Sequence, residues 1–235
     1  MGHLSGPSLI DAAITPGARA TARLERLADW VTISSLATAG GTLVLAGATF
    51  SAVRSSNRSA RVAERSLMAG LRPVLMPSRL DDPPQKVGFV DGHWLRTPGG
   101  GGAVEVTGDA IYLAMSVRNV GAGIAVLHGW RFTKSVSASD PPPSLEAFHR
   151  LTRDLYVPAG DVGFWQGVFR DPSDDEFRDV AAAIEVRERL VIDVLYGDHE
   201  GGQRAVSRLS LTPASDGGWI ASAARHWNID RDDPR

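Results

Sequence analysis

The longest uncharged stretch of the chain runs from Trp30 to Val53, between Asp29 and Arg54. It has twenty-four residues, and about 20 predominantly apolar residues are enough to cover the roughly 30 Å hydrocarbon core of a bilayer as a helix. Leucine, isoleucine, valine and phenylalanine occur eight times in it, and they favour insertion at roughly 0.3–0.6 kcal/mol each. Ten glycine, serine and threonine residues weaken that preference. The pattern predicts a transmembrane helix over residues 30–53.

Two alternatives for this stretch stay open. A buried helix of a soluble core is normally shorter and has polar residues at helical spacing. A cleaved signal peptide has an apolar region of about 7–15 residues close to the start of the chain. Here the apolar stretch is longer and twenty-nine residues precede it, although Ala46, Gly47 and Ala48 are small enough for cleavage. We therefore expect a retained membrane anchor.

The helical pattern continues beyond the uncharged stretch, over residues 54–72. Five arginines follow at spacings of four, three, four and seven residues, which place them on one face of an α-helix. Pro73 disfavours a helical conformation at the residue before it. Basic residues beside a span lie at headgroup level, where each contributes about 1 kcal/mol against an anionic leaflet. We expect lipid headgroup contact from the four nearest the span, with an ordinary solvated face as the alternative: Arg54, Arg58, Arg61 and Arg65.

The arginines also bear on membrane sidedness. Within about 20 residues of the span, the C-terminal flank carries five arginines and the N-terminal flank carries three. Basic residues are retained on the cytoplasmic side of a membrane. We therefore expect a single-pass protein of the plasma membrane whose C-terminal domain faces the cytoplasm. Small residues repeat every four positions at Thr38, Thr42 and Ala46, which could bring two such helices together as a homodimer.

After Pro73 the pattern changes to short β-forming runs separated by turn residues. The last three runs are joined by short turns, so we expect them to pair antiparallel in chain order. Asn119, Gly121 and Gly123 predict a tight connection between the first two runs, and Pro158–Asp161 predicts a turn. The runs cover residues 110–121, 123–132, 154–169, 189–198, 203–213 and 218–229.

One helix interrupts these runs, with Ser173 as its expected N-cap and acidic residues in its first turn. The expected fold class is therefore mainly β: an N-terminal transmembrane helix extended by an Arg-rich juxtamembrane helix, then an antiparallel β-sandwich with one inserted helix. The expected segments are a partly helical N-terminal tail at 1–29, the transmembrane helix at 30–53, the basic helix at 54–72, the β-sandwich domain at 73–230 and a tail at 231–235.

Two loops stand out by composition. Pro98–Gly102 contains four consecutive glycines and predicts a flexible connection, and Ser137–Pro143 contains three consecutive prolines and predicts a stiff surface loop. The five tryptophans after residue 90 are expected mostly in the core or packed on a sheet face, with a platform for a carbohydrate or peptide as the alternative.

The stretches "VRNVGAGIAVLHGW" and "VLYGDHEGGQRAVSR" resemble a group of uncharacterised, mostly actinobacterial, single-span membrane proteins. In that group a terminal helix anchors an immunoglobulin-like β domain. The resemblance covers the anchor, the Arg-rich helix and the strands. It implies a fold and an anchoring mode but no activity.

Charge and composition narrow the partners. Residues 1–80 carry nine arginines against four acidic residues, a net charge of +5, whereas residues 81–235 have a net charge of −7. An acidic domain argues against a nucleic-acid surface, which needs a basic patch. The chain has no cysteine, which excludes disulfides, thiolate metal sites and a cysteine nucleophile.

Motifs for catalysis, cofactors and metals are absent from the sequence: it contains no GxxxxGK[ST], no HExxH and no GxSxG, and the histidines are scattered. We expect no cofactor and no metal, and we favour a membrane-anchored interaction or scaffold module that contacts membrane lipids and a protein partner. Two alternatives stay open: a membrane-tethered hydrolase using His199 or His226 with nearby carboxylates, and a secreted ligand-binding domain.

Overall fold

The computed structural model describes residues 16–134, 136–137 and 140–230, with side chains from residue 26 onward. The chain divides into two units, residues 1–64 and 65–235, each of which is described by itself. The expected C-terminal tail at 231–235 and the first part of the expected N-terminal tail lie outside the described residues. The elements in chain order are α1 Pro16–Gly70, β1 Leu75–Pro77, β2 Gln85–Gly88, β3 Trp94–Thr97, β4 Gly101–Val106, β5 Ile111–Asn119, β6 Ala125–Phe132, a 3₁₀ turn Leu145–Ala147, β7 His149–Val157, β8 Val162–Phe169, α2 Asp175–Glu185, β9 Leu190–Gly197, β10 Ala205–Pro213 and β11 Trp219–Asn228.

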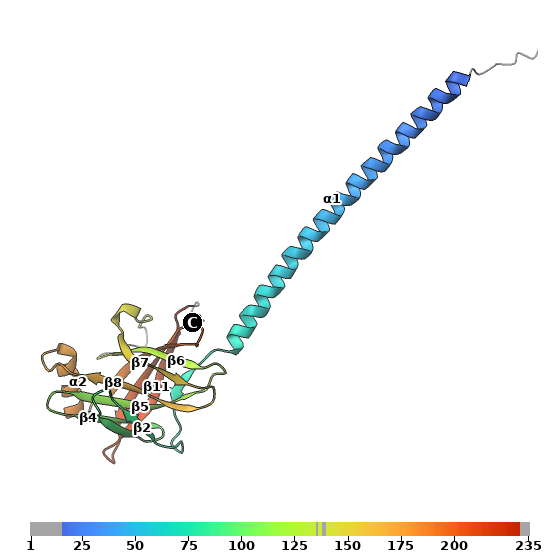
Figure 1. Cartoon of the computed structure of the whole chain (residues 1–235). Coiled ribbons are helices and arrows are strands. Elements are labelled where there is room, and N and C mark those ends of the chain that lie inside the picture. The colour runs from blue at the N-terminus through green and yellow to red at the C-terminus, as the bar shows by residue number, and fades with distance from the viewer. Residues whose placement is uncertain (1–15, 135, 138–139, 231–235) are drawn as a thin grey trace, which may run out of the picture. The chain divides into compact units, whose positions relative to one another are not determined.

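The long helix α1 contains the whole uncharged stretch without interruption and continues to Gly70 (Figure 1). Its last turn closes with the N–H of Leu71 donating to the carbonyl of Leu67 at 3.0 Å, and Pro73 follows, which has no N–H to continue the ladder. The expectation of one continuous helix from Trp30 to about residue 71 is confirmed.

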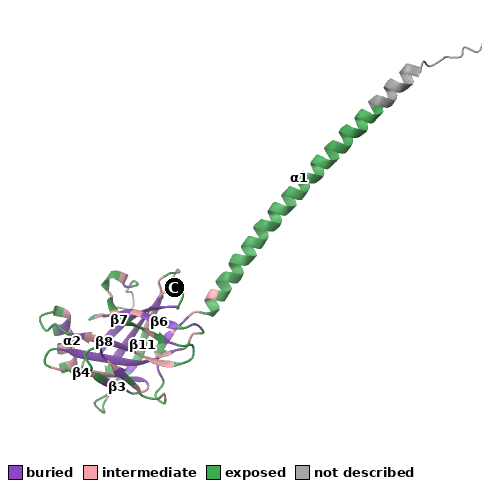
Figure 2. Ribbon diagram, in the orientation of Figure 1, coloured by how far each residue is buried: buried purple, intermediate pink, exposed green. Residues whose placement is uncertain are grey.

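The apolar side chains of α1 between residues 30 and 53 are exposed along the helix (Figure 2). The exposed fraction is 70% for Trp30, 75% for Leu43 and 53% for Val53. Among the described residues this is the one helix long and apolar enough to cross a membrane.

The strands form a curled antiparallel sheet, so the chain is mainly β, as expected. The strand order is β1-β5-β4-β11-β10-β9-β6-β7, and β2 and β3 form a separate hairpin. β8 pairs with the edge of β5 that lies opposite β4. The expected antiparallel pairing of the last three runs is confirmed: Val206 of β10 faces Leu195 of β9 on one side and Trp227 of β11 on the other.

The expected tight connection at Asn119–Gly123 does not make a hairpin. β5 pairs with β1, β4 and β8, whereas β6 pairs with β7 and β9, so the connection carries the chain from one half of the sheet to the other. Likewise, the turn at Pro158–Asp161 links β7 to β8 without any ladder between them.

Asn119 and Gly123 pack this loop against neighbouring main chain. Asn119 is buried and its carboxamide bonds four main-chain groups: it accepts from the N–H of Val74 and Gly121 and donates to the carbonyls of Gly123 and Val157. A methyl group on Gly123 would overlap the carbonyl oxygen of Leu71. The loop is therefore packed against the backbone that follows α1.

The glycine-rich stretch Pro98–Gly102 is a packed turn, and the expectation of flexibility was wrong. The N–H of Gly101 donates to the carbonyl of Pro98 at 3.2 Å, and β4 begins at Gly101. A Cβ on Gly99 would overlap the carbonyl oxygen of Asp82, and one on Gly102 would overlap the side chain of Leu211. Here glycine permits a close approach of backbones, which composition alone does not distinguish from a linker.

Four tryptophans lie in buried positions: Trp130, Trp165, Trp219 and Trp227. Trp94 is the exception, since 57% of it is exposed and the ammonium of Lys86 lies 4.5 Å from its ring centroid. Trp94 packs on the face of the small hairpin, where its ring lies against Gly88 of the neighbouring strand, so the expectation of mostly core or face-packing tryptophans is confirmed.

The inserted helix α2 starts one residue later than expected. Asp174 is the N-cap, and its carboxylate accepts from the N–H of Glu176 at 3.1 Å. Ser173 instead bonds the carboxylate of Asp171. Phe177 and Val180 are buried and attach the helix to the core.

Candidate functional site

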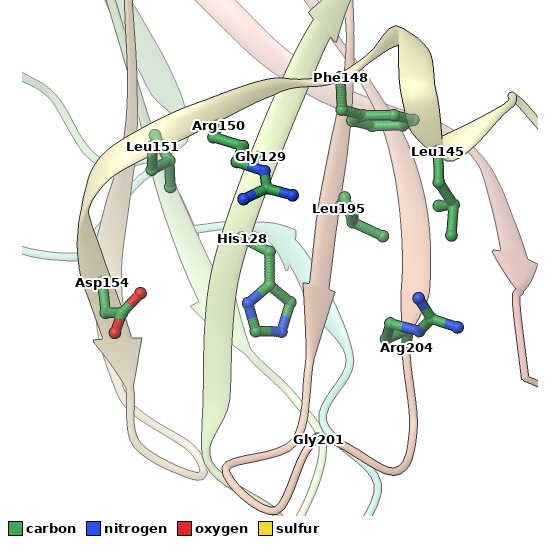
Figure 3. A pocket seen from close by; sticks show the side chains of 10 residues that line it. All are labelled: His128, Gly129, Leu145, Phe148, Arg150, Leu151, Asp154, Leu195, Gly201 and Arg204. Carbon is green, nitrogen blue, oxygen red and sulfur yellow. The ribbon is translucent and has the colours of Figure 1, made fainter.

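A groove opens on the sheet where β7 separates from β6 (Figure 3). Leu127 of β6 faces Leu155 of β7, but the next residue pair is Gly129 with Arg150. Residues 151–154 of β7 and His128 of β6 are therefore skipped by the ladder. Such an irregularity bends the strand and redirects a side chain, and here it leaves space between the bowed strand and the sheet.

His128 is also skipped on its other side, because the ladder with β9 shifts between Leu127 and Gly129. In Figure 3 its imidazole extends into the groove. The side chain is half-buried, and this burial lowers the pKa of His128, while the negative charge of Asp154 opposes the change. Uncharged imidazole can both donate and accept a hydrogen bond at neutral pH.

Part of the groove wall is apolar, and charged side chains form the rest. Leu145 and Phe148 come from the 3₁₀ turn and the residue after it, and they pack against a small cluster on the sheet that includes Leu195, Val206 and Trp227. Leu151 of the bowed strand lines the space from the other direction. The cavity has a volume of about 500 Å³, within the range of roughly 300–1,000 Å³ that small-molecule sites occupy.

Three charged side chains border the groove: Arg150, Asp154 and Arg204 (Figure 3). Arg204 is held by Asp230, with Nη2 to Oδ1 at 2.7 Å and Nε to Oδ1 at 3.1 Å. This hydrogen bond is the main reason that the pKa of Asp230 is lowered. The side chain of Arg150 forms no hydrogen bond or ion pair with any residue in the described part of the chain.

The described residues that line the groove include no serine, threonine, cysteine, lysine or tyrosine. A groove with a partly apolar wall, an unpaired guanidinium and a half-buried imidazole can bind a ligand, and its described lining offers no hydroxyl, thiol or amine nucleophile.

The loop that covers this face is fixed by a buried ion-pair network. Arg208 is 2% exposed and Asp193 is fully buried, and they are joined by two hydrogen bonds of 2.7 and 3.0 Å. Nη1 of Arg208 also donates to Asp140 at 2.7 Å, and this bond lowers the pKa of Asp140. Asp140 belongs to the proline-rich stretch 137–143 that the sequence predicts to be stiff. Residues 138 and 139 lie outside the described residues.

The two histidines of the hydrolase alternative have different surroundings. His199 is exposed in the turn between β9 and β10, where buried Asp198 bonds the N–H of Gly202 at 2.8 Å. His226 of β11 is half-buried, and its Nδ1 lies 3.2 Å from the hydroxyl of Ser207. No hydrogen bond or ion pair found in the described part of the chain joins the two histidines.

Ser207 cannot act as a nucleophile in this arrangement. Its side chain is 2% exposed and its hydroxyl donates to the main-chain carbonyl of Leu75 at 3.1 Å. The hydroxyl of Tyr196 accepts from the N–H of Leu75, also at 3.1 Å. These polar groups therefore hold β1, the first strand after α1, against the sheet.

The remaining described histidines are also held in local contacts. His93 stacks on Tyr112 with ring centroids 4.0 Å apart, and His149 lies 2.7 Å from the carboxylate of Glu176. Among the residues that the structure describes, no group of three or more metal-ligating side chains converges.

The four arginines expected to contact lipid are exposed on α1: Arg54, Arg58, Arg61 and Arg65. None of them forms a hydrogen bond or an ion pair with another side chain in the described residues. Their charge is therefore not neutralised by an ion pair within the described part of the chain.

A scan of protein-family models finds none that matches this chain, and a search of curated proteins finds no matching sequence. Function is therefore inferred from the residues and their geometry.

The groove was not identified from the sequence. Its one signal there is Gly129 inside a β-forming run, since an isolated glycine in a strand often marks a bulge. The skipping of residues 151–154 has no comparable signal, because it depends on which strand β7 pairs with.

Proposed function

We propose that this chain is a single-pass, membrane-anchored interaction module, in which residues 30–53 of α1 lie in the bilayer and the β domain binds a partner. The observation that carries this proposal is the exposure of large apolar side chains along the whole stretch, from Trp30 to Val53. In water this surface would be costly at roughly 25 cal/mol per Å² of apolar area, whereas hydrocarbon covers it.

The hydroxyl groups of the stretch support the same proposal. A free hydroxyl is costly in hydrocarbon, but serine and threonine can bond the carbonyl three or four residues back in the helix. Thr32 bonds Ala28 at 2.8 Å, Ser35 bonds Val31 at 2.7 Å, and Thr38 bonds Ser34 at 2.8 Å. The same pattern recurs at Ser34, Thr42 and Ser51. Most hydroxyl groups of residues 30–53 are thus hydrogen-bonded within the helix.

The unneutralised arginines provide the second part of the proposal. Arg54, Arg58 and Arg61 follow the span directly and carry no partner in the described residues. Against an anionic leaflet each contributes about 1 kcal/mol. With the excess of arginine on this flank, we propose that the β domain is on the cytoplasmic side of the plasma membrane.

The finer assignment of the β domain is also a proposal. We propose that the curled sheet is an immunoglobulin-like sandwich of the kind found in the actinobacterial single-span proteins that the sequence resembles. The crossings from β5 to β6 and from β7 to β8, each between strands without a shared ladder, support two facing layers. The small-residue repeat at Thr38, Thr42 and Ala46 supports a homodimer through the helix.

Membrane extraction of two matched variants tests the anchor. Leu43→Lys places a charge in the proposed span, and Leu67→Lys places one on the same helix beyond it; both leucines are well exposed. A charge at the centre of a span costs about 2.5–3.5 kcal/mol of insertion. We expect the original chain and Leu67→Lys to stay in the membrane pellet after alkaline carbonate treatment, and a larger share of Leu43→Lys to be released. Release of the original chain would reject the anchor.

A further inference from the structure

We propose that the groove between the bowed strand β7 and the sheet binds a small carboxylate with an apolar body. The carboxylate contacts Arg150 and His128, and the apolar body lies against Leu145, Phe148 and Leu195. This inference goes beyond the proposed function, because it does not depend on how the chain is anchored.

Arg150 is the first reason to expect a negatively charged ligand. Its guanidinium carries a permanent positive charge and forms no hydrogen bond or ion pair in the described part of the chain, although it lies at the groove. In Figure 3 it extends from the bowed strand over the sheet, toward the side of the groove where His128 lies. A guanidinium matches the two oxygens of a carboxylate.

His128 provides a second donor and a pH response. Burial lowers the pKa of this imidazole, so it is largely uncharged at neutral pH in the empty groove. The charged groups around it are Asp154 and Arg150 on β7, Asp198 after β9 and Arg204 before β10. A bound carboxylate adds a negative charge, which favours protonation of the ring and raises its pKa. Binding should therefore strengthen as the pH falls from about 7.5 to about 6, a range that includes the ordinary histidine pKa.

The carboxylate of Asp154 limits the negative charge that a ligand can carry in this groove. Asp154 borders the groove and its negative charge acts on His128, whereas Arg204 is already held by Asp230. One permanent unpaired cation facing one carboxylate suits a monoanion better than a phosphate dianion. The apolar part of the wall, formed by Leu145, Phe148 and Leu195, and the volume of about 500 Å³ suit a ring or short alkyl body.

The test uses the full chain in nanodiscs of a neutral phosphatidylcholine, with 3-phenylpropionate as the probe and empty nanodiscs as the blank. NMR of the histidine ring carbons reports on His128, assigned by comparison with His128→Gln. We expect saturable binding with a dissociation constant on the order of 0.1–1 mM for so small a ligand. We expect 3-phenylpropan-1-ol and inorganic phosphate to bind at least about tenfold more weakly.

Two matched variants separate the site from general effects. Arg150→Gln removes the proposed anchor, and Arg96→Gln removes an exposed arginine of β3, away from the groove. We expect Arg150→Gln to weaken binding about tenfold or more, Arg96→Gln to leave it unchanged, and both to unfold at the temperature of the original chain. The proposal is overturned if the alcohol binds as tightly as the carboxylate, if Arg150→Gln binds normally, or if no saturation occurs up to about 10 mM. Each tenfold loss of affinity corresponds to roughly 1.4 kcal/mol of binding free energy.

Discussion

Asn119 holds the main chain of Val74, with its Oδ1 accepting the N–H of Val74 at 3.1 Å. The same carboxamide donates to the carbonyls of Gly123 at 2.6 Å and Val157 at 3.0 Å. One buried side chain thus joins the segment after α1, the β5–β6 connection and the end of β7. In the last turn of α1, the carbonyl of Met68 accepts from Gln203 at 2.6 Å, which adds a second attachment.

Replacing Asn119 by alanine should lower the free energy of unfolding of the β domain by about 2–4 kcal/mol. The substitution leaves several buried main-chain groups without partners, and each costs about 1–3 kcal/mol before relaxation and water entry. Asn57→Ala, on the exposed surface of α1, is the matched control and should change stability by less than about 0.5 kcal/mol. Denaturant unfolding followed by tryptophan fluorescence measures both; equal effects would contradict the role of Asn119.

Replacing Gly123 by alanine should destabilise the domain by about 2 kcal/mol or more. The added methyl group would overlap the carbonyl oxygen of Leu71, and backbone must shift to make room. Gly108 is the control, because nothing lies within 4 Å of a Cβ built there. We expect Gly108→Ala to unfold at the same denaturant concentration as the original chain. A Gly123→Ala variant with unchanged stability would show that this loop is not tightly packed.

The β5–β6 connection could be predicted from the sequence only in part. The sequence predicts the strands on both sides and a tight connection, because Asn119, Gly121 and Gly123 are turn residues. It does not distinguish a hairpin from a crossing between the two halves of a sheet, since both need a short loop. Only the backbone of Leu71, about fifty residues earlier in the chain, explains why glycine is needed at 123, in accord with the rule that glycine permits close approach.

The turn-linked strands were easier to predict. β9, β10 and β11 follow one another with short polar turns, so local pairing costs little loop entropy. The bowing of β7 is different, because it depends on pairing with β6, and the groove at His128 and Arg150 depends on that bowing. For this reason the sequence predicted the long apolar helix and most strands from β5 onward, but neither β1 to β4 nor the candidate site.

Removing Arg208 should be one of the most destabilising single changes in the domain. Asp193 is fully buried, and without Arg208 it loses two hydrogen bonds of 2.7 and 3.0 Å and keeps the one that Arg131 donates at 2.7 Å. Breaking a buried pair costs about 3–5 kcal/mol, and the remaining Arg131 places the expected loss at the lower end, about 3 kcal/mol. We expect that loss for Arg208→Met, and partial recovery when Asp193→Leu is added. Arg178→Met, which breaks an exposed pair with Asp175, should cost less than about 1 kcal/mol. Similar losses for the two single variants would contradict the network.

The carboxyl group of Asp91 should titrate at an unusually low pH. The hydroxyl of Tyr112 donates to it at 2.6 Å, and this bond is the main reason that the pKa falls from 3.8 to about 2. Because the folded-state pKa is lowered, the stabilisation is fully present above pH 3.8 and is lost as the pH falls through about 2. In Tyr112→Phe we expect the pKa to move back toward 3.8, and in the control Tyr156→Phe we expect no change. Carbon NMR of the carboxyl group measures the titration, and a pKa near 3.8 in the original chain would contradict the assigned bond.

Residues 30–53 of α1 are proposed to be surrounded by lipid, and the reactivity of single cysteines tests this directly. The chain has no cysteine, so single cysteines can be introduced along α1 and tested in liposomes with a water-soluble maleimide. Cysteines at the exposed positions Leu36, Leu43 and Val44 lie within the proposed span, and a cysteine at Leu67 lies beyond it.

We expect the three span positions to react at least about a hundredfold more slowly than position 67, because thiolate does not form in hydrocarbon, and we expect detergent to remove this protection at all three. Protection should show no helical period, since every face of this stretch is exposed in the structure. Rapid labelling at position 43 in intact liposomes, or protection that alternates every three to four residues as on a protein-covered helix, would contradict the membrane anchor.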